Sequence, residues 1–535
     1  MMTKRNTMPL PASYPVDSYC SRASLLEFLP QQWLVVLTKG WSSWFLAALL
    51  GAIIPLSFAP FNVQYPFLAY LLFFPISLFV YQILHSHSAK EAFYKGWVFG
   101  TAFFGVGVSW VYVAIHDFGA AHWSLAVLFT SLFVLILSVF YGFFAWSVFN
   151  TTKKLQGRHD TSLILFYVPL LWVLFEWLRS WVLTGFPWLL AGYPMIDTPL
   201  SGYAPVVGVY GLSFLVLLVA MLLSLRIKPI VSVSGMALII IGGVLLGQIQ
   251  WSKPVDEPLS VALIQGNVNQ SVKWNRQQLE ATKKLYVALS KPHWQDNDLI
   301  VWPENAIPVF YHTLENNFYH HLDLQARKTN TELVVGLPVF DDKTEQYYNA
   351  MTNFGGQQSY YYKTHLVPFG EYVPLASLIR GIVKFFNMPM SSFSAGEADQ
   401  DAVTVKGHKA VVTICYEDVF PQDMMQQIPQ SQFMINLSNN GWYGDSFAPH
   451  QHLEMSRMRA LETSRDLIRS TTSGISALID ASGKVLVQGP QFKAAVVKGK
   501  IQPRTGTTPY VFWGNHPIIL LFIIAALVMF RQTRG

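Results

Sequence analysis

Three short apolar runs in the second half of the chain each end on or beside a reactive side chain. One run ends directly before Cys415, a second ends two residues before Glu304, and a third ends directly before Lys363. The runs cover residues 411–414, 299–302 and 360–362. Because the strands of an α/β sheet present functional groups at their carboxyl ends, we expect the three side chains to lie close together. They would supply a nucleophile, a base and a cation.

The chemistry gives each of these side chains a role. A thiol with an ordinary pKa of about 8.5 is mostly protonated near neutral pH, so Cys415 needs a base, and Glu304 is the candidate. Attack on a carbonyl carbon places negative charge on its oxygen, which Lys363 and the backbone N–H of Tyr416 can stabilise. Taken singly, each residue is better explained as a buried cysteine, a solvated acid or a surface lysine. Their joint occurrence favours a catalytic site.

The segments around these positions resemble a known family. The matching segments are Trp302-Pro-Glu304, Lys363 with 365–371, and Cys415-Tyr-Glu417. They are similar to the Glu-Lys-Cys site of the nitrilase superfamily, and within it the chain most resembles the apolipoprotein N-acyltransferases, from about residue 41 to the C-terminus. The resemblance implies an α-β-β-α sandwich in which Glu304, Lys363 and Cys415 are catalytic, with no metal and no cofactor.

The same resemblance implies supporting roles for other residues. Trp274 matches a tryptophan of the family that is implicated in function, although packing is the alternative. Glu371, Tyr416 and Glu417 match residues that support the site by orienting the lysine or a mobile loop, and a purely structural role is the alternative for each. The segment 439–444 departs from the family pattern at its second and third positions, so we predict no catalytic role there.

The composition indicates a membrane protein. Of 535 residues, 52% are hydrophobic and only 13% are charged, whereas soluble domains carry about a quarter charged residues. The net charge of +6 does not indicate nucleic-acid binding, because the cations lie at the ends of apolar segments, where membrane topology explains them.

Eight apolar stretches are long enough for spanning helices, which need about 20 residues each. They cover about 41–59, 66–85, 93–115, 123–149, 162–183, 205–225, 229–250 and 512–530. The predicted fold is therefore a membrane α-helical bundle of about eight spans with an inserted soluble nitrilase-like domain. The predicted divisions are an N-terminal tail (1–40), a seven-span domain (41–254), a catalytic domain (255–508) and a C-terminal span with its tail (509–535).

The charge pattern predicts an orientation. The loops 60–65, 116–122 and 184–204 contain no Lys or Arg, whereas cations lie in the alternate loops and near both termini. By the positive-inside rule, both termini are cytoplasmic and the catalytic domain lies on the periplasmic side of a bacterial inner membrane. Within the fifth stretch, Glu176 and Arg179 share a helix face and can neutralise each other, in a structural or a functional role.

The soluble region alternates short apolar runs with helical stretches, which predicts an α/β domain. The runs cover 261–264, 299–302, 333–335, 411–414, 433–437 and 475–479, and the clearest helical stretches cover 275–290 and 452–465. Cys20 and Cys415 fall on opposite sides of the predicted membrane, so we expect no disulfide. His450 and His452 have too few neighbouring ligands to predict a metal site.

One segment of this region is unusually apolar for a loop. Residues 375–388 carry apolar side chains at roughly helical spacing. A buried core segment is one interpretation. We favour a lid that enters the lipid, with Phe385 and Phe386 at its tip.

The resemblance implies a two-step acyl transfer. An acyl chain would pass from a phospholipid, phosphatidylethanolamine by family analogy, to Cys415, and then to the α-amino group of diacylglyceryl-cysteine in an apolipoprotein. One alternative is a membrane-tethered nitrilase-type amidase acting on a small amide, which would share the site but would not require the preceding spans. A second alternative is a transporter or scaffold with an inactive enzyme domain, which the intact catalytic residues oppose.

Overall fold

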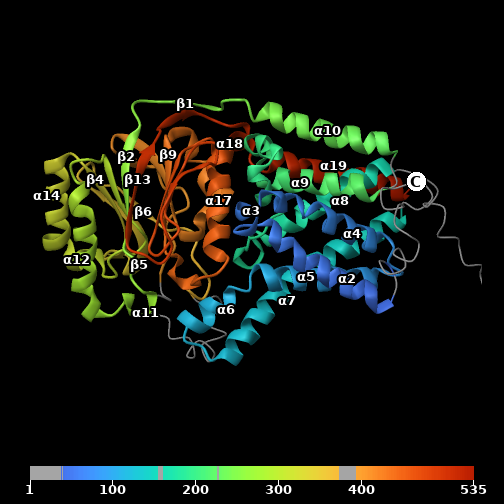
Figure 1. The fold of residues 1–535 in the computed structure, drawn as a ribbon, viewed down its shortest axis with the longest axis horizontal. Helices are drawn as coiled ribbons and strands as arrows, with labels where there is room; N and C mark the ends of the chain where they lie inside the picture. The colour runs from blue at the N-terminus through green and yellow to red at the C-terminus, as the bar shows by residue number, and fades with distance from the viewer. Residues whose placement is uncertain (1–37, 39, 155–160, 226–227, 373–392, 535) are drawn as a thin grey trace, which may run out of the picture.

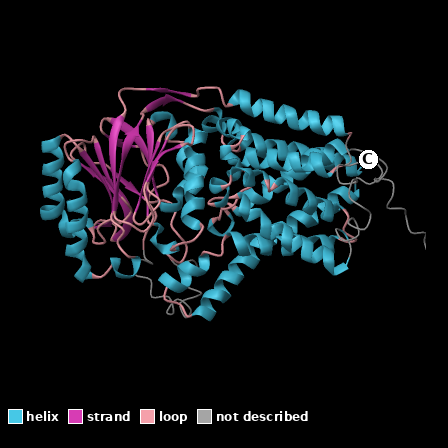
Figure 2. Ribbon diagram, in the orientation of Figure 1, coloured by secondary structure: helices cyan, strands magenta, loops and turns pink. Residues whose placement is uncertain are grey.

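The computed structural model describes residues 38, 40–154, 161–225, 228–372 and 393–534. It contains a bundle of helices and, at one end of that bundle, two stacked β-sheets flanked by further helices (Figures 1 and 2). All strands lie between α10 (Pro229–Leu246) and α19 (His516–Arg534) in the chain. The sheet domain is therefore an insertion between two helices of the bundle.

Apolar helices joined by short turns build the bundle. Besides α10 and α19 they are α2 (Gly40–Ile53), α3 (Phe61–Gln64), α4 (Phe73–Leu84), α5 (Ala89–Gly107), α6 (Val111–Val113), α7 (Trp123–Lys154), α8 (Thr161–Arg179) and α9 (Ala204–Ser224). Each of the eight predicted stretches overlaps one of these helices.

The length and hydropathy of the helices indicate how many of them can span a membrane. Within the described residues, five segments are long and apolar enough to cross a membrane, and α5 followed by 111–118 makes a sixth if its 59° bend lies within one span. The last helix contributes a shorter apolar run, His516–Val528. The protein thus has several apolar helices, and the count of eight spans stays a prediction.

Glu176 and Arg179 are both buried near the end of α8, and each binds the segment that follows the helix. Glu176 Oε1 accepts hydrogen bonds from Trp172 Nε1 (2.9 Å) and from the backbone N–H of Ala191 (2.8 Å). Arg179 donates to the carbonyl oxygen of Trp188 at 2.8 Å. The two charges therefore fix the chain after α8 against the helix, which is a structural role.

The inserted domain holds two six-stranded sheets. The first has the order β13-β2-β3-β4-β5-β6 and the second β12-β11-β10-β9-β8-β7. The first contains β2 (Leu259–Gln265), β3 (Leu299–Trp302), β4 (Glu332–Asp341), β5 (Gln346–Phe354), β6 (Tyr360–Tyr362) and β13 (Ala495–Ile501). The second contains β7 (Val403–Val405), β8 (His408–Ile414), β9 (Phe433–Ser438), β10 (Leu467–Thr471), β11 (Ala477–Ile479) and β12 (Val485–Gln488).

Each sheet has a parallel centre with antiparallel edges. Strands β2, β3 and β4 run parallel, as do β8, β9 and β10, while the outer strands pair antiparallel. These central strands are buried almost throughout, because both faces of the sheet are covered. That burial explains the apolar runs at β2, β3, β4 and β8, whereas β9 and β10 also carry buried polar residues such as Asn436 and Arg469.

Helices complete the layers on both sides. In Figure 1, α12 (Leu279–Ser290) and α14 (His320–Thr329) lie outside the first sheet, and α17 (Ala448–Thr463) lies between the second sheet and the bundle. The layer order α-β-β-α confirms the predicted nitrilase-like sandwich. Shorter helices lie in the connections: α11 (Gln270–Lys273), α13 (Tyr311–Leu314), α16 (Pro421–Met425) and α18 (Pro509–Trp513).

Each of the six apolar runs of the sandwich coincides with or overlaps a strand, namely β2, β3, β4, β8, β9 and β11. Strands β5, β7, β10, β12 and β13 were not predicted, and the predicted helices differ from the observed ones at their ends. The helix predicted from residue 275 begins at Leu279, because Asn275 caps a separate turn through its side chain. The helix predicted from residue 452 begins at Ala448, with Pro449 in its first turn, where a missing N–H costs nothing.

A two-stranded ribbon joins the sandwich to the bundle. Strand β1 (Ser252–Pro254), which follows α10, pairs antiparallel with β14 (Arg504–Gly506), which precedes α18 and α19, and Ser252 lies opposite Gly506. The chain enters and leaves the sandwich at this ribbon. The C-terminus lies at the end of the bundle away from the sheets (Figure 1).

Candidate active site

The three predicted catalytic residues lie at the ends of three strands, and all three are buried. Glu304 follows β3 and Lys363 follows β6 in the first sheet, while Cys415 follows β8 in the second. The carboxyl ends of strands from both sheets therefore bring the carboxylate, the ammonium and the thiol to one end of the sandwich.

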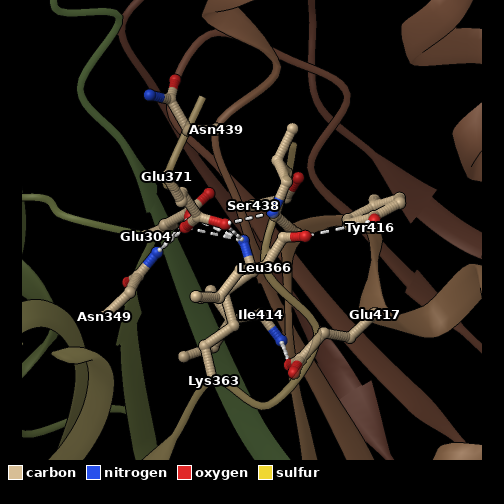
Figure 3. Close-up of polar contacts among 12 residues, drawn as sticks. Glu304, Asn349, Lys363, Leu366, Glu371, Ile414, Tyr416, Glu417, Ser438 and Asn439 are labelled. Atoms are coloured by element: carbon tan, nitrogen blue, oxygen red, sulfur yellow. Dashed lines mark hydrogen bonds and ion pairs between the residues drawn. The ribbon is translucent and has the colours of Figure 1, made fainter. Parts of the chain in front are cut away.

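Lys363 lies between two carboxylates. Its Nζ is 2.9 Å from Glu371 and 3.6 Å from Glu304 Oε1. Asn349 Nδ2 donates to Glu304 Oε1 at 2.7 Å and to Glu371 Oε1 at 2.8 Å, so one amide holds the two acids beside each other (Figure 3). Glu371 also accepts a hydrogen bond from the backbone N–H of Val367 at 2.8 Å. This contact fixes the Glu371 carboxylate against the loop that follows Lys363.

These charges keep Lys363 an ammonium. Burial acts to lower the pKa of Lys363, but the charges of Glu371 and Glu304 outweigh it and hold that pKa well above its usual range. Glu304 Oε2 is buried and has no hydrogen-bond partner within the described residues. The site thus combines a fixed cation with a carboxylate oxygen that is free to accept a proton.

Cys415 is held in a strained backbone conformation. Strand β8 ends at Ile414, and Cys415 begins a tight turn with a φ of 57°, a left-handed value that non-glycine residues adopt rarely. Burial, and next the charge of Glu304, raise the pKa of the Cys415 thiol to about 12, although the charge of Lys363 acts to lower it. The resting thiol is therefore protonated, and its attack requires a base.

Glu417 joins the cysteine turn to the lysine loop. Its carboxylate accepts the backbone N–H of Ile414 at 2.6 Å, of Thr364 at 2.7 Å and of His365 at 3.0 Å. Tyr361 adds a hydroxyl hydrogen bond at 3.1 Å. Burial raises the pKa of Glu417, while the charge of Lys363 and these backbone donors act to lower it. Glu417 therefore positions the backbone on both sides of the site.

The other predicted residues divide into three groups. Tyr416 is buried, and its hydroxyl donates to the carbonyl oxygen of Leu366 at 3.4 Å (Figure 3). Trp274 is half-buried at the end of α11, and its Nε1 has no partner within the described residues. Phe385 and Phe386 lie outside the described residues, so the lid stays a prediction.

Two residues of the site were missed in the sequence. Asn349 lies on β5, where it bridges Glu304 and Glu371. Lys273 is buried beside Trp274, and its Nζ donates to the backbone oxygen of Glu304 at 3.2 Å. Burial lowers the pKa of Lys273 to about 8, although the charges of Glu304 and Cys415 act to raise it. The only sequence signal was the position of Lys273 next to a tryptophan already singled out.

His452, one of the two histidines considered as metal ligands, lies in a buried polar cluster. His452 Nε2 lies 2.7 Å from Asp418 Oδ1, and both side chains are fully buried. In the described part of the chain, no three His, Cys, Asp or Glu side chains are grouped as metal ligands would be. Cys415 is a free thiol, and Cys20 lies outside the described residues.

Comparison with known families divides the chain as the fold does. Residues 50–222 match the model of the apolipoprotein N-acyltransferase N-terminal domain, and residues 260–510 match the carbon-nitrogen hydrolase model. Among solved structures, the sandwich is similar to Nit3 of Saccharomyces cerevisiae, a nitrilase-superfamily member, at 20% identity and a TM-score of 0.36 over 47% of this chain and 93% of that one. An amidase from Nesterenkonia sp. AN1 is similar at 16% identity and a TM-score of 0.34, over 46% and 90%.

Curated relatives match nearly the whole chain. Apolipoprotein N-acyltransferase of Methylococcus capsulatus is 37% identical over 90% of this chain and 95% of its own length. Those of Coxiella burnetii and Pseudomonas aeruginosa are 38% and 39% identical, over 91% and 92% of this chain and 99% and 97% of their own lengths.

The fold and the site define a nitrilase-type hydrolase domain carried on an apolar helical bundle. With whole-length relatives at this identity, the chain belongs to the apolipoprotein N-acyltransferase family.

Proposed function

We propose that this protein transfers a fatty acyl chain from a membrane phospholipid to the N-terminal amine of diacylglyceryl-cysteine in bacterial apolipoproteins, through a thioester on Cys415. The observation that carries the proposal is the buried group of Glu304, Lys363 and Cys415 in a chain whose helical half also matches the acyltransferase family. Family membership gives no support to the amidase alternative, which needs only the sandwich.

In the first half-reaction, Cys415 Sγ attacks the ester carbonyl carbon of the phospholipid. Glu304 Oε2, which has no other partner within the described residues, accepts the thiol proton. Lys363 Nζ and the backbone N–H of Tyr416 stabilise the oxyanion. The bond from the carbonyl carbon to the glycerol oxygen then breaks, and Glu304 returns the proton to that oxygen. The products are an acyl thioester and a lysophospholipid.

In the second half-reaction, the neutral α-amino group of the apolipoprotein attacks the thioester carbon. Glu304 accepts a proton from the attacking nitrogen, the carbon–sulfur bond breaks, and the proton passes to Cys415 Sγ. Lys363 stabilises the oxyanion again, because both half-reactions pass through a tetrahedral intermediate. A fixed cation therefore serves both steps.

The proposed donor is phosphatidylethanolamine, and the proposed location is the inner membrane with the sandwich in the periplasm. The charge pattern of the loops supports this orientation. The position of the C-terminus at the bundle end away from the sandwich is consistent with a cytoplasmic tail (Figure 1). In this arrangement the site lies close to the outer leaflet, from which acyl chains can reach Cys415.

Intact-protein mass spectrometry tests the proposal. The purified protein is incubated with phosphatidylethanolamine and no acceptor, and we expect the mass of one fatty acyl group on Cys415 and none on a Cys415→Ala variant. Addition of a diacylated lipopeptide should then remove the acyl group and yield a triacylated lipopeptide. A protein that gains no acyl mass but hydrolyses small amides would contradict the proposal.

A further inference from the structure

The turn that carries Cys415 is held by a chain of buried polar side chains. Asn436 Nδ2 donates to the Cys415 carbonyl oxygen at 2.9 Å, and Asn436 Oδ1 accepts from Arg469 at 2.8 Å. Arg469 in turn lies 3.4 Å from Asp418, three residues after the cysteine. A non-glycine residue with left-handed φ persists only where its surroundings enforce it, and these contacts supply that constraint.

Helix α17 extends this chain to the face of the sandwich that meets the bundle. His452 and Ser456, one turn apart on α17, both hydrogen bond to Asp418, at 2.7 and 2.5 Å. Ser456 also accepts from Arg469 at 2.8 Å. Each of these four side chains is buried, so no bulk water can replace a lost partner. The orientation of α17 and the geometry of the cysteine turn are therefore linked.

The residue before His452 contacts the bundle. Gln451 Oε1 accepts from the indole N–H of Trp188 at 2.7 Å and of Trp110 at 3.1 Å, and Gln451 Nε2 donates to the Gly107 carbonyl oxygen at 3.1 Å. The ring of Trp188 also lies against the ring of His452, with centroids 5.8 Å apart. One buried amide thus makes three hydrogen bonds across the junction of the two domains.

The bundle residues that bind Gln451 lie on irregular segments with fixed positions. Gly107 ends α5, and Trp110 lies in the 59° bend that follows. Trp188 lies in the segment after α8 that Arg179 and Glu176 hold. The Trp110 ring also packs against Tyr443, at 5.0 Å. Burial, and next the charges of Cys415 and Glu304, raise the pKa of Tyr443, although the charge of Lys363 acts to lower it. These bundle segments therefore approach the catalytic site itself.

We propose that Gln451 is a positioning residue that couples the bundle segments carrying Trp110 and Trp188 to the turn that holds Cys415 for attack. This inference rests on the proposed function, because the effect is measured on acylation of Cys415. A bundle that changes position would change the reactivity of the nucleophile through α17, without any bundle residue touching the reacting atoms.

The same helix offers a matched control. Glu454, three residues after Gln451, accepts from Asn62 of the bundle at 2.6 Å, and both side chains are buried. Within the described residues, no hydrogen bond joins the Glu454 side chain to the Asp418 cluster. Asn62→Leu and Gln451→Met each remove one buried amide from the same junction, but only Gln451→Met interrupts the path to the cysteine.

The experiment measures single-turnover acylation of Cys415 by labelled phosphatidylethanolamine in the full-length protein, together with the melting temperature. We expect similar losses of melting temperature in both variants. Acylation by Gln451→Met should be slower by about 10-fold or more, since displacements of about 1 Å at a reacting group can cost about 10²-fold. Asn62→Leu should acylate close to the wild-type rate.

A second readout is the pH dependence of Cys415 alkylation by iodoacetamide. Burial is the main cause of the raised thiol pKa, so a relaxed turn should shift the profile of Gln451→Met to lower pH and leave that of Asn62→Leu in place. If Gln451→Met does not accumulate, Gln451→Glu keeps the accepting oxygen and alters the group facing Gly107, and the same slowing relative to Asn62→Leu is expected.

Two results would overturn the inference: wild-type acylation rates in folded Gln451 variants, or equal slowing in Asn62→Leu. A wild-type protein that forms no thioester would instead contradict the proposed function, so the two failures are distinguishable.

Discussion

At the scale of single residues, the site separates a fixed charge from a free proton acceptor. Lys363 is bound by Glu371 and lies near Glu304, whereas one oxygen of Glu304 has no partner within the described residues. The charge of Glu304 also raises the pKa of Cys415, after burial. The same carboxylate therefore opposes ionisation of the resting thiol and, in the proposed mechanism, accepts its proton during attack.

This double effect predicts opposite changes in Glu304→Gln. Acylation by phospholipid should fall by about 10²- to 10⁴-fold, because the positioned base is lost. Alkylation by iodoacetamide at a fixed pH below about 12 should accelerate, because loss of the negative charge lowers the thiol pKa and raises the thiolate fraction. Acylation by labelled phospholipid and the alkylation profile measure the two effects. Equal slowing of both reactions would show that Glu304 acts only through structure.

Substitution of the cation should slow both half-reactions alike. Lys363→Met removes the ammonium that meets the oxyanion, so we expect losses of about 10²- to 10³-fold in thioester formation and in transfer to a lipopeptide. Single-turnover acylation followed by a lipopeptide chase measures the two steps separately. Cys415→Ala, which cannot form the thioester, provides the zero level. A loss confined to one step would limit Lys363 to one intermediate.

Residue types, chain order and the family resemblance were sufficient to predict that Glu304, Lys363 and Cys415 lie together, since each follows an apolar strand. Their catalytic roles stay a prediction. They were insufficient for Asn349 and Lys273. Asn349 gains its role only because β5 brings it beside two acids that lie 45 residues before it and 22 residues after it. Nothing in the sequence distinguishes Lys273 from a surface lysine, and only the packing of α11 shows that it is buried.

At the scale of elements, the turns after β6 and β8 depend on a single carboxylate. Glu417→Ala would leave the buried N–H of Ile414 and the partly buried N–H groups of Thr364 and His365 without their acceptor. An unsatisfied buried donor costs about 1–3 kcal/mol, and a partly buried one costs less because water can reach it. We expect a lower melting temperature and a large loss of acylation. Asp423→Ala, which removes a partly exposed acid beside His365, is the control and should change little. A fully active, equally stable Glu417→Ala would contradict this role.

The apolar segment 375–388 lies outside the described residues, and its lid role is a prediction from composition alone. Replacing Phe385 and Phe386 with Ser should slow acylation by long-chain phospholipid, because the lid would lose apolar surface in contact with acyl chains. Alkylation of Cys415 and the melting temperature should stay close to wild-type. Loss of folded protein would show instead that the two rings belong to the core.

The two clearest helices and the most apolar strands were predicted from the sequence pattern, but the ends of the helices were not. The helix start at Leu279 depends on the side-chain cap of Asn275, and the start at Ala448 depends on Pro449 in the first turn. These are local backbone features, and the spacing of apolar residues does not indicate them. Five of the six central strands contain a predicted apolar run, because burial on two faces leaves such runs. The sixth, β10, was not predicted, because Arg469, Ser470 and Thr471 interrupt its apolar pattern.

At the scale of the whole molecule, orientation in the membrane is the main prediction. With the loops free of Lys and Arg outside, a cysteine introduced at Gly119 in the loop 116–122 should react with a membrane-impermeant thiol reagent in intact cells, in a Cys415→Ala background. A cysteine at Lys154 should react only after the cells are permeabilised. Labelling of the Lys154 position in intact cells would contradict the orientation.

The pairing of β1 with β14 has a consequence for how such a protein can arise. Because Ser252 lies opposite Gly506, the first and last residues of the sandwich are neighbours, and removing the whole domain would leave a gap that a short turn could close. Adjacent ends are the condition under which one domain tolerates the insertion of another. The arrangement is therefore that of a complete domain inserted into the connection between two helices of the bundle. A longer helix in the bundle or an added strand in the sandwich can therefore occur without altering the β1–β14 ribbon that joins them.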